Sequence, residues 1–441
     1  MQTTEILTDL KNLIDEDRLE ELSGISHPLG NCGDVKVSPY TEEEIAAILK
    51  YANRNGLTVS IIGGGTKRGF GGQNEKADIL LSMSQYTGVV EHTVGDMTLT
   101  VKSGTPFKVI QDCLAAYNQK IPLDPFWPQH ATIGGIIAVN DSGPRRLGYG
   151  SARDAVIGLK VVYPDGTIIR AGGKVVKNVA GYDMNKLFIG SMGTLGVLSE
   201  VTIKLRPIAK YESLLLLSFP KGSVEEIRRF AIEVLDSSLE PVCLELLNSS
   251  MSKAMTGEKK TSLVISFEDV ESSVRYQEEW IRKITPPSAN LTILHKDEIK
   301  RFWETFYQKS PNGASELISY ETNAALKLGV VNLDIIKIIQ ESEAIQDLYN
   351  VLIEAHGGLG HGLCQVNITG ASENVVSAIT TLRELAVNLG GYAVAKHLPF
   401  FLRKEVSVWG EKPSSYFLFE GIKAKVDPNK LLNPNRFVGG I

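Results

Sequence analysis

The most informative stretch of this sequence is SIIGGGTKRGFGG, at residues 60–72. The apolar, β-branched run 57–62 predicts a buried strand that leads into it, and a capping-box helix is expected to begin after Thr41 and to end at Gly56. Consecutive glycines permit positive φ, and successive amide groups can then form a concave anion-binding loop. The stretch therefore predicts a helix, a strand and a phosphate-binding loop, in that order.

Two common phosphate-binding loops do not match this stretch. A P-loop ends in Gly-Lys-Ser/Thr, whereas here Thr66 precedes Lys67. A Rossmann loop opens a helix, but residues 67–72 are not helix-forming. On these letters alone, a tight loop between strands with no ligand stays open as the alternative.

The composition is that of a globular protein with more than one core. At 441 residues the chain exceeds the size at which a single core stops growing. Its 41 glycines exceed the usual share of about 7% and gather between residues 56 and 196. The formal net charge of -5, without a basic tail, argues against a nucleic-acid partner.

The four cysteines indicate a reducing compartment. They lie far apart with no CxxC pair, so no zinc knuckle, iron–sulfur ligand set or disulfide framework is expected. Residues 1–22 are typical of an acidic amphipathic helix rather than a signal, and no apolar run is long enough to cross a membrane. These features predict a cytoplasmic protein without a transmembrane segment.

Further elements are expected on both sides of Pro207. Before it, the sequence predicts a helix after Pro106 and a strand-rich glycine region that contains residues 132–137, 156–163 and 193–198, the last leading into 201–205. After it, glycine density falls and strands alternate with helices. This alternation predicts a separate α+β unit over roughly 210–400.

Three long motifs, taken in order, carry a resemblance to a known family. They are the run at residues 60–72, then PFWPQHATIGGIIAVNDSGPRRLGYGSARDAVIGLKVVYPDGTII at 125–169 and GGKVVKNVAGYDMNKLFIGSMGTLGVLSEVTIKLRP at 172–207. They resemble the FAD-binding domain of the vanillyl-alcohol oxidase and p-cresol methylhydroxylase (PCMH) superfamily. Within it, the chain is most similar to the smaller flavin subunit of bacterial glycolate oxidases. The resemblance covers residues 35–210 and returns in the tail, VDPNKLLNPNRF at 426–437.

The resemblance implies an α+β fold in which a two-lobed FAD-binding domain precedes an α+β cap domain. The expected division is an N-terminal helical segment at 1–34, the FAD domain at 35–210, the cap or substrate domain at 211–400 and a segment at 401–441 that packs back on the FAD domain. FAD should be bound non-covalently, because members that tether it use a His or Cys in the first glycine loop, and this loop contains neither.

The resemblance also implies which residues hold FAD. The pyrophosphate should contact the first glycine loop, and the other residues should line the diphosphate, flavin, ribityl or adenine regions. The expected set is Gly63, Gly64, Gly65, Thr66, Ala131, Thr132, Gly134, Gly135, Asn140, Ser142, Gly143, Gly193, Thr194, Gly196 and Val197.

The resemblance to glycolate oxidases implies oxidation of a 2-hydroxy acid. This reaction needs a base for the hydroxyl proton and a cation for the carboxylate. Related D-2-hydroxy acid dehydrogenases carry H-x-G-D-G-N-L-H and G-E-H-G motifs that bind a metal and place a base. Aligned on residues 366–368, this chain has Gly358, Gln365 and Lys396 at the three ligand positions, so we expect no metal. Lys396 is the candidate carboxylate binder and His397 the candidate base. His356 and His361 are interpreted as marking a turn.

The leading hypothesis is a flavin subunit that oxidises glycolate or D-lactate by hydride transfer to flavin N5. Electrons would leave to an iron–sulfur partner, with a second flavin subunit and peripheral membrane association through partners also implied. The alternative is a non-catalytic FAD-bearing or structural subunit of a glycolate oxidase complex. A stand-alone reductase that uses a nicotinamide nucleotide is the weaker third possibility, because no second nucleotide fingerprint is present.

Overall fold

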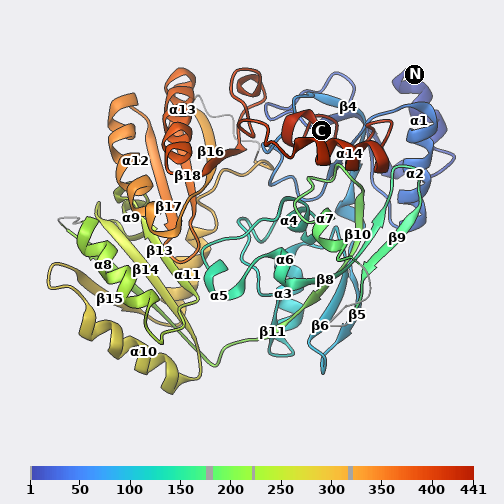
Figure 1. The fold of residues 1–441 in the computed structure, drawn as a ribbon. Coiled ribbons are helices and arrows are strands. Elements are labelled where there is room, and N and C mark those ends of the chain that lie inside the picture. Colours follow the sequence, from blue (N-terminus) through green and yellow to red (C-terminus); the bar gives the residue numbers. More distant parts are fainter. Residues whose placement is uncertain (1, 175–181, 221–223, 316–320) are drawn as a thin grey trace.

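The computed structural model describes residues 2–174, 182–220, 224–315 and 321–441 (Figure 1). Residues 175–181 of the third glycine motif therefore lie outside the described part. The described chain forms two sheet-containing lobes and a cap domain with its own large sheet. This arrangement confirms the α+β fold class.

The first lobe is a four-stranded sheet with strand order β1-β2-β4-β3, and β4 is parallel to both of its neighbours. Thr41 caps helix α2 with a complete capping box, and Gly56 ends it at φ 65°. Both helix signals are thereby confirmed. The elements are α1 (Thr3–Leu10), β1 (Leu19–Glu21), β2 (Cys32–Val37), α2 (Glu42–Asn55), β3 (Val59–Ile62) and β4 (Lys76–Ser82).

The second lobe is a five-stranded antiparallel sheet with strand order β5-β6-β10-β8-β9. A short pair, β7 and β11, lies at its border with the cap domain. The strands are β5 (Val89–Thr93), β6 (Thr98–Lys102), β7 (Gln119–Lys120), β8 (Val156–Val162), β9 (Ile168–Gly172), β10 (Val197–Lys204) and β11 (Arg206–Pro207). The helices are α3 (Phe107–Ala115), α4 (Ile133–Val139), α5 (Arg146–Tyr149), α6 (Ala152–Ala155) and α7 (Asn185–Phe188).

The strand expected at residues 132–137 is wrong, because this segment forms helix α4. Ile133, Ile136 and Ile137 are all buried at helical spacing against the core of the second lobe. A short apolar run cannot be assigned by periodicity alone, since buried helices and buried strands share it. Gly134 lies so close to Ser103 that a Cβ there would be 2.6 Å from the serine Cβ. Gly134 thus permits close packing of the helix against Ser103.

The cap domain is built on an eight-stranded sheet with order β15-β12-β14-β13-β17-β18-β16-β19. Its strands are β12 (Tyr211–Phe219), β13 (Cys243–Leu247), β14 (Thr261–Asp269), β15 (Asn290–Leu294), β16 (Thr322–Gly329), β17 (Leu352–Gly358), β18 (Leu363–Gly370) and β19 (Tyr392–His397). Its helices are α8 (Val224–Leu235), α9 (Ser249–Thr256), α10 (Glu271–Ile284), α11 (Asp297–Phe306), α12 (Ile335–Tyr349) and α13 (Ser372–Asn388).

The two faces of this sheet are covered differently. Helices α8, α10, α12 and α13 lie on the outer face with the main core, as the left side of Figure 1 shows. Helices α9 and α11 lie on the other face, where they share a core with β12, β13 and β14, and α9 also contacts β17. The inner face of β16 to β19 is therefore turned to the FAD-binding lobes.

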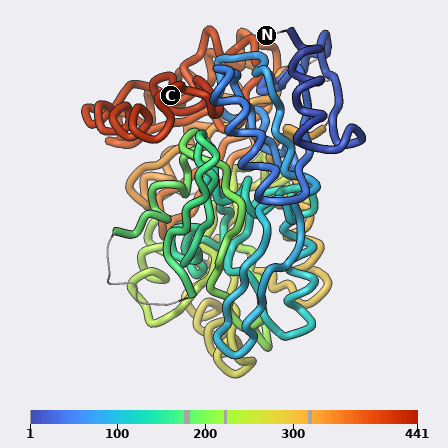
Figure 2. The backbone as a smooth tube through the Cα atoms, turned by 90° about the vertical axis from the view of Figure 1, so that its right-hand side faces the viewer, coloured from blue at the N-terminus to red at the C-terminus, as the bar shows by residue number. Residues whose placement is uncertain are grey.

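The C-terminal tail returns to the first lobe and lies beside the N-terminal elements (Figure 2). Helix α14 (Tyr416–Val426) leads to residues 431–433. The amide of Val59 donates to the carbonyl of Leu431, and the carbonyl of Val59 accepts from the amide of Asn433. Leu432 forms a parallel bridge with Val59, which extends the sheet at β3. No described helix is both long enough and apolar enough to span a membrane.

Candidate active site

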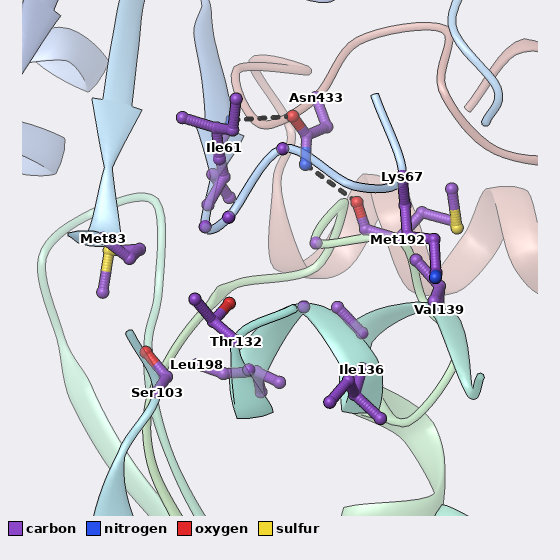
Figure 3. A pocket seen from close by; sticks show the side chains of 18 of the residues that line it. Ile61, Lys67, Met83, Ser103, Thr132, Ile136, Val139, Met192, Leu198 and Asn433 are labelled. Carbon is purple, nitrogen blue, oxygen red and sulfur yellow. Dashed lines mark hydrogen bonds between the residues drawn. The ribbon is translucent and has the colours of Figure 1, made fainter. Parts of the chain in front are cut away.

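A cleft lies where the end of β3, helix α4 and the turn before β10 meet (Figure 3). About 870 Å³ of space free of protein atoms, including open solvent at its mouth, lies between these elements. The Asn433 side chain accepts from the amide of Ile61 at 2.9 Å and donates to the carbonyl of Met192 at 2.8 Å. The C-terminal tail thus joins the two lobes at one wall of the cleft.

The first glycine loop fits against the segment before α4 without room for side chains. A Cβ at Gly64 would lie 1.7 Å from the carbonyl oxygen of His130, and one at Gly63 would lie 2.1 Å from Thr132 Oγ1. Both distances are far below van der Waals contact. The run of glycines in the sequence is therefore required by close packing of two loops.

The same loop offers unpaired donors and positive charge. In the described chain, the backbone amides of Gly64, Gly65 and Thr66 donate to no acceptor. Arg68 and Arg436 also line the cleft, and neither pairs with a described carboxylate. Unpaired amides beside two guanidinium groups suit a pyrophosphate. The described residues thus fit FAD at this cleft.

The structure brings most of the expected cofactor residues together. Those that line the cleft are Gly63, Gly64, Gly65, Thr66, Ala131, Thr132, Gly134, Gly135, Gly193, Gly196 and Val197. Three others, Asn140, Ser142 and Gly143, line a second cavity beside the cleft. Thr194 lines neither, because its hydroxyl donates to the carbonyl of Ser191 and its own carbonyl accepts from Lys423.

The second cavity adjoins the cleft, and Val139 and Met192 line both. Its far wall is the inner face of the cap sheet. Strand register places His356 opposite Gln365, Gln365 opposite Lys327, and Lys327 opposite Val394. These four residues form one row across β17, β18, β16 and β19, and all of them line the cavity.

A buried carboxylate joins the cleft to the cavity. Asp141 is 2% exposed, and its two oxygens lie 3.0 Å from Lys67 Nζ and 2.9 Å from Lys396 Nζ. Lys67 lines the cleft and Lys396 the cavity. Burial alone would raise the pKa of Asp141, but Lys396 and Lys67 outweigh burial and hold it below its ordinary value. Asp141 is therefore ionised and connects the FAD domain to the cap domain.

Asp141→Asn should destabilise the protein markedly at pH 7. The substitution leaves two neighbouring lysines without their carboxylate, and breaking a buried pair costs roughly 3–5 kcal/mol. Because the folded-state pKa is depressed, this stabilisation is present above the carboxyl's ordinary pKa and is lost as pH falls through the folded value. Urea unfolding at pH 7 and at acidic pH measures the effect. Equal stability of the two proteins at pH 7 would contradict it.

A histidine and a glutamate are paired at the wall of the second cavity. His356 Nδ1 lies 2.6 Å from Glu245 Oε1, and both side chains are buried. His356 Nε2 is buried and has no partner among the described residues. In the tautomer of the neutral imidazole that donates Nδ1–H to this carboxylate, Nε2 carries the free lone pair.

His361 lies beside the same carboxylate, with its Nε2 at 4.0 Å from Glu245 Oε2. Burial lowers the pKa of His361 more than Glu245 raises it, so this imidazole is neutral at pH 7. Among the described residues no group of three or more His, Cys, Asp or Glu side chains could hold a metal ion.

His397 is not placed with Lys396, because adjacent residues of β19 point to opposite sides of the strand. His397 lines neither the cleft nor the cavity and packs against Gly69, where an added Cβ would lie 2.5 Å from Nδ1. Burial, with Arg403 and Lys67, lowers the pKa of His397 to about 3. A group with this pKa is a weak proton acceptor at neutral pH.

Sequence reasoning missed Asp141, Glu245 and His356 as site residues. His361 lies in the β17–β18 turn, whereas His356 lies within strand β17, and both line the cavity. The alignment on residues 366–368 assigned Gly358 and Gln365 to the positions of the two motif histidines, whereas in the hairpin Gln365 lies opposite His356. The available signal was the position of His356 in a largely apolar segment, which indicates a buried histidine. The spacing of residues along the sequence could not show that Glu245 is its partner.

Comparison with known proteins agrees with this geometry. Residues 34–172 match the family described as FAD binding domain, and residues 332–437 match the C-terminal domain of FAD linked oxidases. D-lactate dehydrogenase of Archaeoglobus fulgidus is 28% identical over 96% of this chain and 96% of its own. Glycolate oxidase subunit GlcD of Bacillus subtilis is 28% identical over 91% of this chain and 88% of its own.

The fold is similar to that of a solved structure. The crystal structure of p-cresol methylhydroxylase with substrate bound superposes with a TM-score of 0.76 at 13% identity, covering 98% of this chain and 96% of that chain. At this identity the likeness establishes the architecture. Both lobes and the cap domain are included in it.

Proposed function

The chain belongs to the superfamily of FAD-linked oxidoreductases with a PCMH-type FAD-binding domain, and from this premise we propose that it oxidises a small 2-hydroxy acid. The observation that carries the proposal is the cavity that adjoins the FAD cleft and holds both the Glu245–His356 pair and several cations. The named activities of its relatives, D-lactate dehydrogenase and glycolate oxidase, support the same reaction class.

FAD is held by the glycine loop at Gly63–Thr66 and the segments around Thr132 and Gly193. When bound, it supplies the acceptor for the hydride of the substrate carbon. We propose that binding is non-covalent, which is supported by a described cleft lining without His or Cys.

The residues of the second cavity perform the remaining tasks. Lys396 binds the substrate carboxylate through its ammonium, which Asp141 and Gln365 hold at 2.9 and 3.2 Å. His356 Nε2 accepts the proton of the C2 hydroxyl, and Glu245 orients the imidazole through Nδ1. Loss of this proton and of the C2 hydride converts the 2-hydroxy acid to the 2-oxo acid.

Anaerobic mixing of the purified flavoprotein with 2-hydroxy acids tests this function. Glycolate, the two lactates and the 2-hydroxy dicarboxylates should be compared, and at least one should bleach the flavin absorption near 450 nm, because reduction removes that band. An unbleached band with every acid would overturn the proposal and favour a non-catalytic FAD-bearing subunit. Dithionite reduction serves as the control that the flavin is accessible.

We propose further that electrons leave through an iron–sulfur partner, in a cytoplasmic complex with a second flavin subunit. The Bacillus subtilis relative is itself described as a subunit of glycolate oxidase. Cys32, Cys243 and Cys364 are buried and separate in this chain, which leaves cluster binding to a partner. Purification of the tagged protein from its own cells, followed by a visible spectrum of the co-purifying subunits, tests this assembly.

A further inference from the structure

Lys327 is a cation without a counter-charge in the second cavity. It is partly buried on β16 and lines the cavity, and its ammonium forms no hydrogen bond or ion pair with any described residue. Removing such a charge from water is unfavourable unless a partner compensates for it. A site that retains an unpaired lysine in this position is therefore suited to an anionic ligand.

Arg146 is a second cation of the same kind. Its guanidinium donates to Ser142 Oγ at 3.0 Å, and it contacts no carboxylate in the described chain. Burial, then repulsion by Lys396 and Arg146, lowers the pKa of Lys327 to about 8. Lys327 is still largely protonated at pH 7, and Lys396 and Arg146 both lie close enough to repel it.

The carboxylates of the cavity do not neutralise these two residues. Asp141 is shared between Lys67 and Lys396, and Glu245 lies 2.6 Å from His356. The proposed function assigns the carboxylate next to the reacting carbon to Lys396, whose ammonium has three hydrogens and bonds to two described acceptors, Asp141 and Gln365. Arg146 and Lys327 then remain without a counter-charge. A second anionic group on the substrate would supply it, whereas glycolate and lactate each carry only one carboxylate.

We propose that Arg146 and Lys327 form a second anion subsite, so that the substrate is a 2-hydroxy acid with a further carboxylate or phosphate-type group. The oxidation of such a substrate rests on the proposed function, whereas anion binding at this subsite does not depend on turnover. The subsite distinguishes dianionic from monoanionic 2-hydroxy acids by charge.

Calorimetric titration with acids that cannot be oxidised tests the subsite. Glutarate and 3-phosphonopropionate are the dianionic probes, and butyrate is the monoanionic control. At least one dianion should bind about 10- to 100-fold more tightly than butyrate at pH 7, because each charged hydrogen bond adds a factor in this range. The dianion that binds identifies the second group as a carboxylate or a phosphate-type group. Equal affinity for all three acids would overturn the proposal.

Variants of Lys327 make the test specific. Lys327→Met should reduce the affinity for dianions about tenfold or more and leave the affinity for butyrate within about twofold of the wild-type value. It should also raise the midpoint of thermal unfolding, because an unpaired buried charge is removed. Lys327→Arg should retain the preference for dianions, and Lys337→Met on the exposed face of α12 should change nothing. An equal loss of affinity for mono- and dianions in Lys327→Met would contradict the subsite.

The two proposals fail in different ways. If dianions bind as expected but no 2-hydroxy acid bleaches the flavin, the subsite stands and the oxidation is wrong. If lactate or glycolate bleaches the flavin while the dianions show no preference, the oxidation stands and the subsite is wrong.

Discussion

Gly64→Ala should yield a protein without bound FAD. The added Cβ would lie 1.7 Å from the carbonyl oxygen of His130, so either the glycine loop or the segment before α4 must move. Such a movement displaces the unpaired amides of Gly64, Gly65 and Thr66, on which pyrophosphate binding depends. We expect purified Gly64→Ala to lack the flavin absorption near 450 nm, with an FAD occupancy reduced at least tenfold.

Gly95→Ala is the matched control, because a Cβ at Gly95 meets no atom within 4 Å. It should retain full occupancy. Circular dichroism of the Gly64→Ala apoprotein separates loss of cofactor from loss of fold, since the two lobes and the cap sheet have their own cores. A folded Gly64→Ala protein with a full complement of FAD would contradict the role of this loop.

The FAD domain could be predicted because its signals are local. The capping box at Thr41, the stop at Gly56 and the glycine run after β3 each depend on a few consecutive residues, and all three are confirmed. Helix α4 shows the limit of such reasoning. Its apolar run of six residues is too short for periodicity to decide between helix and strand, and packing against the second lobe decides it.

The second cavity could not be predicted in the same way, because its residues come together only through long-range strand pairing. Glu245 and His356 are 111 positions apart, and Asp141 and Lys396 are 255 apart. The expected pair His397 and Lys396 illustrates the reverse error. They are neighbours in sequence, but a strand turns neighbouring side chains to opposite sides, and only Lys396 lines the cavity.

His356→Ala should abolish most substrate oxidation while leaving FAD bound. Removal of Nε2 removes the group that accepts the hydroxyl proton, and general-base catalysis contributes about 10²- to 10⁴-fold. The rate of anaerobic flavin reduction should fall by this factor in stopped-flow experiments. Substrate affinity should change little, because Lys396 still binds the carboxylate. Glu245→Gln should show a smaller loss, since its amide can still contact Nδ1 but no longer stabilises the protonated imidazole.

Two histidine variants decide whether this effect belongs to His356. His92→Ala is the control, because His92 bonds to Gln119 in the second lobe, away from both cavities. His397→Ala tests the base expected from the sequence, and it should keep more than about a tenth of the wild-type rate, because its imidazole lines neither cavity. A loss of about 10²-fold or more in His397→Ala, with His356→Ala close to wild type, would reverse the assignment. Comparable losses in both would instead indicate that the two imidazoles act on the substrate through a rearranged β19, which the buried pair of Lys396 and Asp141 opposes.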